Sequence, residues 1–562
     1  MKTTARSLAF ELASLLLAAC GQNDCETYFE KLNSQAQAEY QIPVRPGTDG
    51  THPFWNEYAL KFIYAPAFDF PEQEGAAKYR FTLEDYGDGK AISHLYYATV
   101  GPDPETGATL HTLPYDPQTL KGGKWTFEAA SPKADLSPVW QDLPVGPVHL
   151  TVEALDGAGK VTGKVAERNF FRDFPFSGPY PGKVRPYRTA ARQALVYLHT
   201  RPYVQHWLEN DDVDLSYAYN TYLCKMLGST VSMECMVARL IPELRDEALA
   251  IARKVAAFII EQSQPEGAPL AFFPPTYYKG QVASSFAENQ DRTMMLEACF
   301  PANGFLDLYD LTGEKEYLDR AVGIAATFQK HQAADGLFPV KVIFSTGEPD
   351  TDGKAMAGTL LNFFLRLEQD YGIKEFHDTM DLGCKWMREN IVTAWNFTAQ
   401  FEDVTVRGLK PYRNLTHCAT DPFIDYLLAR YPHPDAELMK EVEEMLRWSE
   451  DQFVSWNTLP DKYGCKFMNT PCAVEQYLYR SPIDATISNI AMSSMNYYNA
   501  TGDNLWMEKA RALMDNVTIV QDALTGRIPT GFEIELCTVD WLNCMTTTVA
   551  ALVRMADMMG EE

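Results

Sequence analysis

The apolar residues of this chain repeat with one period before about residue 187 and with another period after it. Between Phe54 and Phe171 they recur at every second position, so that Tyr79, Phe81 and Leu83 alternate with polar residues. Alternation of this kind is typical of half-buried β-strands, whereas a helix needs apolar residues three and four apart. The change of period predicts two folding units, first a β unit and then an α unit, which is consistent with a length of 562 residues.

The first unit is predicted to span residues 51–172 as a small antiparallel β-sandwich, similar to fibronectin type III or immunoglobulin-like modules. Val148, Leu150 and Val152 alternate with polar residues, and an Asp156-Gly157 turn follows. Residues 173–186 combine prolines and glycines with aromatic residues. We expect this segment to be a packed linker and not a flexible one.

Residues 187–562 show helical periodicity, and we expect twelve helices there. Half of them have one apolar face, which is typical of an outer helix, and the other half are richer in small and apolar residues, which is typical of an inner helix. The expected outer helices are 187–209, 243–263, 314–331, 374–391, 435–455 and 503–521. The expected inner helices are 213–228, 292–311, 354–371, 417–431, 484–501 and 541–558.

An internal sequence echo indicates a repeated helical hairpin. Residues 308–314 (LYDLTGE) resemble residues 497–503 (YYNATGD), and an amphipathic segment follows each of them. In both, a glycine is placed to end the inner helix, and an acidic residue suits the start of the outer helix. Six such hairpins would close into an (α/α)6 toroid, which makes the chain mainly α. An open helical solenoid is the alternative.

The first residues of the chain look like a targeting segment. Residues 1–19 combine a short basic start with an apolar run, and Leu17-Ala18-Ala19 precedes Cys20. This pattern resembles a bacterial lipoprotein signal, in which the cysteine is lipidated. We therefore expect a signal peptide at 1–19, a polar tether at 20–50, and a lipid anchor at Cys20 on the outer membrane or in the periplasm. An ordinary secretory signal is the alternative.

Charge and cysteine content narrow the function. The formal charge of −26 argues against nucleic acid as a partner, and no run of uncharged apolar residues is long enough to span a membrane, so we expect membrane contact only through the anchor. The cysteines form no metal-type spacing with histidine, so we expect neither a metal nor a cofactor. Cys465/Cys472 and Cys537/Cys544 could form disulfides, but buried thiols are the more common state. The oligomeric state stays open, a homodimer included.

In a closed toroid the loops that enter the inner helices meet on one face, so we expect the functional site there. These loops carry acids next to aromatic, amide and basic side chains, a mixture suited to sugars because aromatic faces stack on pyranose rings. The candidate catalytic residues are Glu402 and Asp484, with Glu288, Asp291 and Asp403 in reserve. The candidate substrate-binding residues are Tyr217, Trp395, Tyr412, Arg413, His417, Tyr477, Asp540, Trp541 and Asn543.

Glycoside hydrolysis explains the preference for Glu402 and Asp484. The reaction needs two carboxyl groups on either side of the scissile bond, about 6.5–9.5 Å apart for inversion and about 5–5.5 Å apart for retention. Acids from different hairpins can lie on opposite sides of a pocket, whereas neighbours in one loop cannot. Each acid taken singly also has a simpler explanation, since a carboxylate at a helix start commonly caps the helix.

Two other functions stay open. A polysaccharide lyase would need a Tyr or His base and a group that neutralises a uronate carboxylate, and Tyr217, Tyr412, Tyr477, Arg413 and His417 could supply them. A surface glycan-binding lipoprotein would need no acid pair. The sequence contains no serine-hydrolase elbow, no Walker loop and no dinucleotide-binding fingerprint.

Taken together, the signal, the small β-sandwich and the toroid resemble polysaccharide-utilisation enzymes of gut-type bacteria. Residues 400–403 (QFED), 475–477 (EQY) and 540–544 (DWLNC) are similar to loops of the exo-acting β-glucuronidase family of (α/α)-barrel glycoside hydrolases. The resemblance covers most of the chain in architecture but only these stretches in sequence. It implies removal of a terminal glucuronic acid from a plant-type glycan, with Arg413 and His417 as partners for the uronate.

Overall fold

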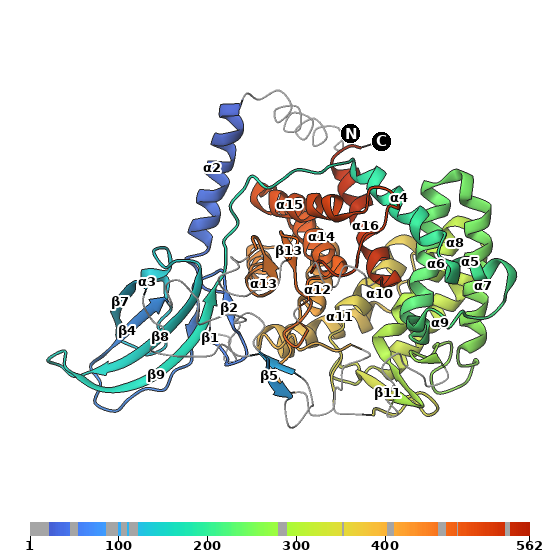
Figure 1. Cartoon of the computed structure of the whole chain (residues 1–562). Helices are drawn as coiled ribbons and strands as arrows, with labels where there is room; N and C mark the ends of the chain where they lie inside the picture. Colours follow the sequence, from blue (N-terminus) through green and yellow to red (C-terminus); the bar gives the residue numbers. More distant parts are fainter. Residues whose placement is uncertain are drawn as a thin grey trace.

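The structure is a computed structural model in which a ring of helices packs beside a smaller β region (Figure 1). It describes residues 22–44, 54–85, 99–102, 109–111, 122–278, 289–350, 353–401, 410–458, 468–479, 481–533 and 540–561. Within these residues, no helix is both long enough and apolar enough to cross a bilayer.

The inner helices form a closed ring. Each inner helix packs on the next one along the chain, and the last, α16, packs back on the first, α6. This closing contact confirms the toroid and excludes the open solenoid. In the described residues the inner helices are α6 (Leu223–Leu240), α8 (Cys299–Thr312), α10 (Gly358–Tyr371), α12 (Asp421–Arg430), α14 (Asp484–Thr501) and α16 (Leu542–Met558).

The outer helices alternate with the inner ones along the chain and cover them. The predicted echo is confirmed at Gly313 and Gly502, which end α8 and α14 with φ values of 70° and 76°, a conformation that glycine adopts without strain. The outer helices are α4 (Tyr187–His199), α7 (Arg245–Gln262), α9 (Lys315–His331), α11 (His377–Met387), α13 (Ala436–Phe453) and α15 (Asn504–Val520).

Neighbouring inner helices run parallel and approach closely at glycines. Arg366 of α10 binds Asp307 of α8 at 2.9 Å, and both residues occupy the same depth in their helices. A Cβ at Gly228 of α6 would lie 2.5 Å from the backbone nitrogen of Pro301 at the start of α8. Because that distance is far below van der Waals contact, glycine is required where these helices meet.

The parallel arrangement brings the N-terminal ends of all six inner helices to one face of the ring. The predicted helix bounds are confirmed to within a few residues except at the first hairpin and at the second inner helix. The helix expected at 292–311 begins only at Cys299, because Arg292–Met294 form a short strand and Met295–Ala298 a 3-10 turn. The helix expected at 187–209 breaks at Pro202 into α4 and α5 (Pro202–Glu209), and the helix expected at 213–228 begins only at Leu223. Asp214 accepts a hydrogen bond from the backbone nitrogen of Ser216 at 2.8 Å, so the acidic cluster caps a turn instead of starting the helix.

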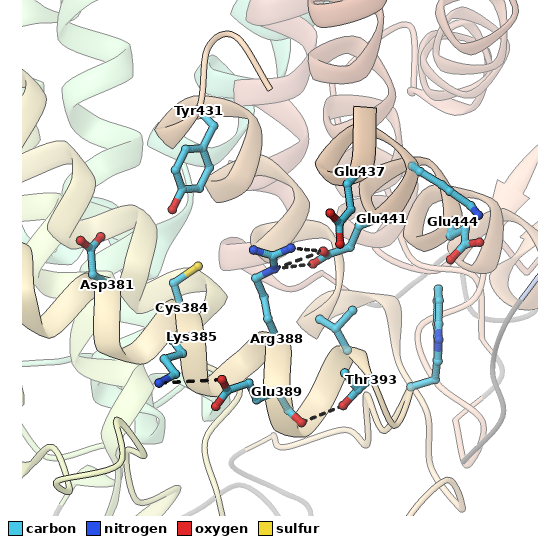
Figure 2. Close-up of a pocket in the computed structure, with 13 residues that line it drawn as sticks. Asp381, Cys384, Lys385, Arg388, Glu389, Thr393, Tyr431, Glu437, Glu441 and Glu444 are labelled. Atoms are coloured by element: carbon cyan, nitrogen blue, oxygen red, sulfur yellow. Dashed lines mark hydrogen bonds and ion pairs between the residues drawn. The ribbon is translucent and has the colours of Figure 1, made fainter. Parts of the chain in front are cut away.

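A surface groove lies between the outer helices α11 and α13 (Figure 2). Its volume is about 880 Å³, and its walls are mostly charged. Arg388 forms a two-pronged ion pair with Glu441, and Lys385 lies 3.9 Å from Glu389. The groove is therefore an acidic surface on the outside of the ring, in which ion pairs neutralise only part of the charge.

The β region contains a five-stranded sheet in the order β2-β9-β8-β4-β7. Strand β2 is parallel to β9, and the other neighbours are antiparallel. The alternation seen in the sequence is real, because Tyr79, Phe81 and Leu83 are all buried on one face. The strands are β2 (Lys61–Phe62), β4 (Lys78–Asp85), β7 (Lys124–Ala129), β8 (Gly146–Leu155) and β9 (Val161–Arg172).

The second sheet of the expected sandwich is not found in the described residues. The other described strands of the β region form only two-stranded pairs, namely β1 (Phe54–Trp55) with β3 (Ala67–Phe68) and β5 (Thr99–Pro102) with β6 (Thr109–His111). The sheet is covered partly by α3 (Ser137–Trp140), whose Trp140 stacks on Phe170 of β9 with ring centroids 6.1 Å apart. The short helix α3 thus covers part of the sheet face that a second sheet was expected to cover.

The segment expected to be a polar tether forms a helix, α2 (Gln22–Glu39), which docks on the ring. Its Leu32 and Ala36 are buried, and Tyr28 donates a hydrogen bond to Glu508 of α15 at 3.3 Å. The sequence prediction was wrong here because the apolar residues are few among many polar ones. They nevertheless lie at helical spacing on a single face.

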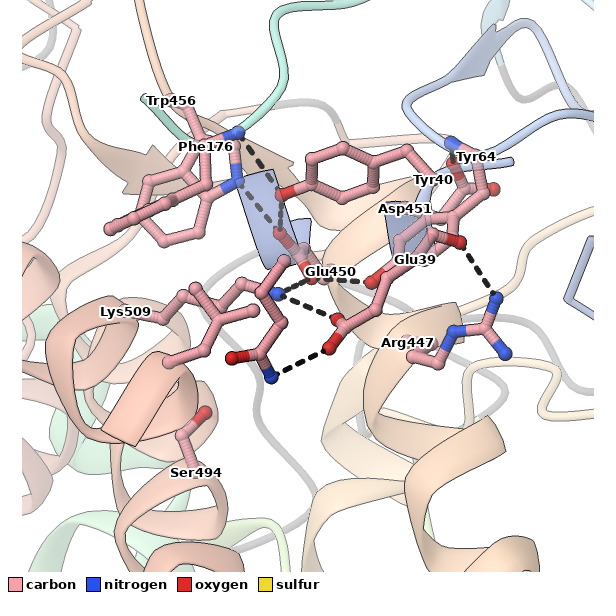
Figure 3. Close-up of polar contacts among 12 residues, drawn as sticks. Glu39, Tyr40, Tyr64, Phe176, Arg447, Glu450, Asp451, Trp456, Ser494 and Lys509 are labelled. Carbon is pink, nitrogen blue, oxygen red and sulfur yellow. Dashed lines mark hydrogen bonds and ion pairs between the residues drawn. The ribbon is translucent and has the colours of Figure 1, made fainter. Parts of the chain in front are cut away.

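One buried carboxylate joins α2, the β region and the ring (Figure 3). Glu450 of α13 accepts hydrogen bonds from the hydroxyls of Tyr40 and Tyr64, both at 2.8 Å, and from the indole nitrogen of Trp456 at 2.9 Å. Lys509 of α15 pairs with the same carboxylate at 2.6 Å. A buried charge is tolerated only with such partners, so this joint fixes how the parts of the chain pack together.

Candidate functional site

The predicted catalytic acids fall into two groups. Glu288, Glu402 and Asp403 lie outside the described residues. Asp291 lies at the start of the β10 (Arg292–Met294) and β11 (Lys341–Ile343) hairpin, with a φ of 53°. Its carboxylate accepts hydrogen bonds from the backbone nitrogen of Ser345 at 2.9 Å and from its hydroxyl at 2.6 Å. Asp291 therefore holds a turn together.

Asp484 is the predicted acid that lies inside the ring. It begins α14 and is fully buried, and its Oδ2 accepts a hydrogen bond from Thr548 of α16 at 3.0 Å. Oδ1 has no hydrogen-bond partner among the described residues. Burial raises the pKa of Asp484 well above its usual range, with a further contribution from the charge of Asp540, while Thr548 opposes the shift. Burial thus favours the protonated form of Asp484, the state required of a general acid.

Charged groups and a second thiol from several segments lie within electrostatic range of Cys544 at the start of α16. Burial raises the pKa of the Cys544 thiol well above its usual value, the charges of Asp484 and Glu475 add to the shift, and Lys225 of α6 opposes it. Cys418 also contributes to this field. We call these five residues the ring-end cluster. They come from four different parts of the chain, which the fold brings within electrostatic range of Cys544.

Lys225 brings positive charge to this cluster. Its ammonium lies 3.8 Å from Glu297, just before α8, and 5.8 Å from the centre of the Phe401 ring. Both Lys225 and Glu297 are mostly buried, at 13% and 10% side-chain exposure. Lys225 is not among the predicted site residues, because it lies within the helix expected at 213–228, whereas the candidates were sought in the loops that enter the inner helices.

Aromatic residues line the same end of the ring. Trp541, just before α16, lies 5.8 Å from Tyr219 and 6.4 Å from Tyr479, measured between ring centroids. The indole nitrogen of Trp541 and Oδ1 of Asn543 are buried and have no hydrogen-bond partner among the described residues. An aromatic wall next to unpaired polar atoms is what a sugar ring with hydroxyls would satisfy.

Tyr217 and Asp540, both predicted to bind substrate, have their polar groups occupied. The Tyr217 hydroxyl donates to the backbone oxygen of Asp540 at 3.0 Å and accepts from the backbone nitrogen of Leu542 at 3.1 Å. The carboxylate of Asp540 pairs with Arg527 at 2.6 Å and accepts a hydrogen bond from Tyr197 at 2.7 Å. These two residues position the Trp541 segment.

Trp395 and Tyr477 are buried in the core, and Tyr412 is partly buried and packs against it. Trp395 is 3% exposed and packs 6.3 Å from Trp448, measured between ring centroids. The Tyr412 hydroxyl donates to the backbone oxygen of Ala394 at 2.9 Å, and the Tyr477 hydroxyl donates to Gln452 at 2.5 Å. The sequence could not distinguish these aromatic residues from those of the wall, because both sets follow the same loops.

Arg413 and His417 are also buried. Arg413 lies within electrostatic range of Tyr58 in the β region, where burial raises the pKa of the tyrosine and the charge of Arg413 opposes that shift. His417 Nδ1 lies 2.7 Å from Oδ2 of Asp421, at the start of α12. Its counter-ion is therefore supplied by the chain itself.

Two further cavities lie between the inner helices. One of about 390 Å³ is lined by α6, α8, α10 and α16, and one of about 300 Å³ by α8, α10, α12 and α14. In the part of the chain that the structure describes, no group of three or more His, Cys, Asp or Glu side chains is arranged to hold a metal ion.

No protein-family model matches the chain, and no curated protein sequence matches it. Among solved structures, the chain is similar to a family 76 glycoside hydrolase from a bovine Bacteroides thetaiotaomicron strain, with 8% identity, 88% of this chain and 95% of that chain covered, and a TM-score of 0.46. It is also similar to cellobiose 2-epimerase from Spirochaeta thermophila, with 10% identity, 68% and 100% covered, and a TM-score of 0.47. An unsaturated glucuronyl hydrolase specific for heparin matches with 10% identity, 66% and 96% covered, and a TM-score of 0.42. Similarity at this level transfers no activity to this chain.

Proposed function

We propose that the chain is an exo-acting glycoside hydrolase that removes a terminal acidic sugar, β-linked glucuronic acid, from a polysaccharide. The observation that carries the proposal is Asp484, a fully buried carboxyl with a raised pKa at the end of the ring. A protonated acid of this kind can give its proton to the glycosidic oxygen as the bond breaks. A structural carboxylate in a helix cap would instead be ionised and fully hydrogen-bonded.

The second carboxyl group is assigned to Glu402, with Glu475 as the described alternative. Glu475 lies in the loop before α14 and adds to the electrostatic field around Cys544, as Asp484 does. Glu402 comes from the preceding hairpin and lies outside the described residues. In this mechanism the second group acts as an ionised base or nucleophile on the other face of the sugar.

The preference for an acidic sugar rests on Lys225. Its ammonium is mostly buried at the same end of the ring as Asp484 and Trp541. A uronate carboxylate that enters a site rich in acids needs a local positive charge, and a partly desolvated lysine meets that need. The wall of Trp541, Tyr219 and Tyr479 would hold the sugar ring by stacking.

We also propose that the protein acts on polysaccharide from a lipid anchor at Cys20, on the outer membrane or in the periplasm. Cys20 lies outside the described residues, so this proposal rests on the signal-like sequence alone. Incorporation of labelled fatty acid in a bacterial host, lost in Cys20→Ala, tests it. An unlabelled wild-type protein would contradict it.

The activity is tested with purified full-length protein on a panel of aryl glycosides that includes the β-glucuronide. We expect release of the aryl group from the glucuronide and no rise in ultraviolet absorbance on uronic-acid polysaccharides. An increase in absorbance would reveal the unsaturated product of a lyase. Binding of glycan without any cleavage would favour the non-catalytic alternative.

A further inference from the structure

Cys418, His417 and Asp421 form a chain of contacts at the start of α12. The Cys418 sulfur lies 3.9 Å from Nε2 of His417, and Nδ1 of the same ring lies 2.7 Å from Oδ2 of Asp421. Ser449 of α13 donates a hydrogen bond to the other oxygen of Asp421 at 3.0 Å. The carboxylate thus fixes the imidazole so that its second nitrogen faces the thiol, the arrangement that activates a nucleophile.

The electrostatics of the histidine agree with this geometry. Burial alone would lower the pKa of His417, but Cys418 and Asp421 raise it to about 10. The imidazole therefore holds a proton at neutral pH. Asp421 compensates the positive charge inside the protein, so the ion pair needs no help from solvent.

Cys418 is also accessible, unlike the other described cysteines. It is partly exposed. It belongs to the ring-end cluster, because its charge acts on Cys544 together with those of Asp484 and Lys225. The remaining free cysteines that the structure describes are all buried, namely Cys224, Cys235, Cys299, Cys384, Cys472 and Cys544.

We propose that Cys418 is a reactive thiol that attacks carbon electrophiles at the open end of the ring. In the step, Cys418 reacts as the thiolate, which the neighbouring imidazolium of His417 stabilises, and the thiol proton passes to solvent because Nε2 of His417 already carries one. The thiolate forms a carbon–sulfur bond while the bond from that carbon to its leaving group breaks, and the leaving group departs with the electron pair. With iodoacetamide the products are the S-alkylated cysteine and iodide.

The test is alkylation of the full-length protein by iodoacetamide at neutral pH, followed by peptide mapping. We expect Cys418 to react about tenfold faster than glutathione, since a stabilised thiolate is more abundant than in a free thiol although each thiolate is less nucleophilic. In Asp421→Asn the rate should fall to about that of glutathione. In Cys224→Ser, which removes a buried thiol, labelling at Cys418 should be unchanged.

The outcomes separate an activated thiol from an ordinary one. Labelling of Cys418 no faster than that of glutathione, or at the same rate in Asp421→Asn as in the wild type, would overturn the proposal. If Asp421→Asn does not fold, the comparison of the wild-type peptide with glutathione still decides. The labelling requires no glycan, so a protein that hydrolyses no glycoside can confirm or contradict this proposal independently.

Discussion

Thr548 of α16 donates a hydrogen bond of 3.0 Å to Oδ2 of Asp484 of α14, and Ser488 of α14 donates to Thr548 in turn at 3.1 Å. This relationship places the candidate acid between the last two inner helices. It also shows why the site depends on the whole fold: the acid acquires its buried environment only when α16 packs between α14 and α6.

The close packing of α6 on α8 predicts that a side chain at Gly228 destabilises the ring. In Gly228→Ala the new Cβ meets the backbone of Pro301 at 2.5 Å, so α6 and α8 must separate. We expect the free energy of unfolding to fall by about 1–3 kcal/mol, although alanine favours a helix more than glycine. Urea unfolding measures this change. The matched control is Gly157→Ala, where nothing lies within 4 Å, and equal stability of the two variants would contradict the predicted contact.

The Glu450 joint predicts graded losses of stability. Glu450→Gln leaves the buried Lys509 with only the more distant carboxylate of Glu39, at 3.9 Å, as counter-ion and should cost about 3–5 kcal/mol. Tyr40→Phe removes a single hydrogen bond to the same carboxylate and should cost about 1–2 kcal/mol. Urea unfolding of both variants measures the order. A larger loss in Tyr40→Phe than in Glu450→Gln would show that the joint does not depend on the charge.

The titration of Asp425 of α12, which faces the cavity of about 300 Å³, predicts a pH dependence of stability. Desolvation raises its pKa to about 7 from an ordinary 3.8, while Asn496 and Ser493 oppose the shift. Between pH about 4 and about 7, the carboxyl of Asp425 keeps its proton in the folded state and loses it in the unfolded state. Its contribution to the free energy of unfolding is therefore complete below pH about 4 and is lost as the pH rises to about 7. Asp425→Asn should flatten that fall, as followed by urea unfolding across this range. An unchanged pH dependence would contradict the shift.

Lys225 predicts selectivity for the acidic sugar. In Lys225→Met the uronate loses its positive partner, so KM for the aryl glucuronide should rise by about tenfold or more. Any residual turnover of a neutral aryl glycoside should change less, because that substrate carries no carboxylate. Steady-state kinetics on both substrates distinguish the cases. An equal effect on the two would mean that Lys225 acts on the packing of the site, not on the substrate.

The ring could be predicted from sequence because its signals are local. Gly313 and Gly502 mark helix ends through their own backbone conformation. The spacing of the apolar residues shows which face of each helix or strand is buried. The tether was mispredicted because α2 buries few residues, and Glu450, which binds Tyr40 just after α2, is 410 residues further along the chain. The start of α6 was mispredicted because the carboxylate of Asp214 caps a turn as readily as a helix.

The site was harder to predict than the fold. Asp484 was predicted as a candidate because an acid at the start of an inner helix must lie near the end of the ring, and the structure places it, buried, at the start of α14. Tyr477 and Trp395 follow the same loops, yet their side chains pack into the core, and no local pattern shows which way a loop side chain points. Lys225 and Cys418 join the cluster through contacts between distant segments, which a sequence does not display.

The central claim is that Asp484 supplies the proton for glycoside cleavage at the end of the closed ring. Its direct test is turnover of an aryl β-glucuronide by Asp484→Asn, with Asp425→Asn as the matched control, since both replace an acid of raised pKa on an inner helix. We predict that Asp484→Asn loses about 10²–10⁴-fold in kcat while its thermal midpoint and the activity of Asp425→Asn stay near wild type. Wild-type turnover in a folded Asp484→Asn protein would contradict the claim.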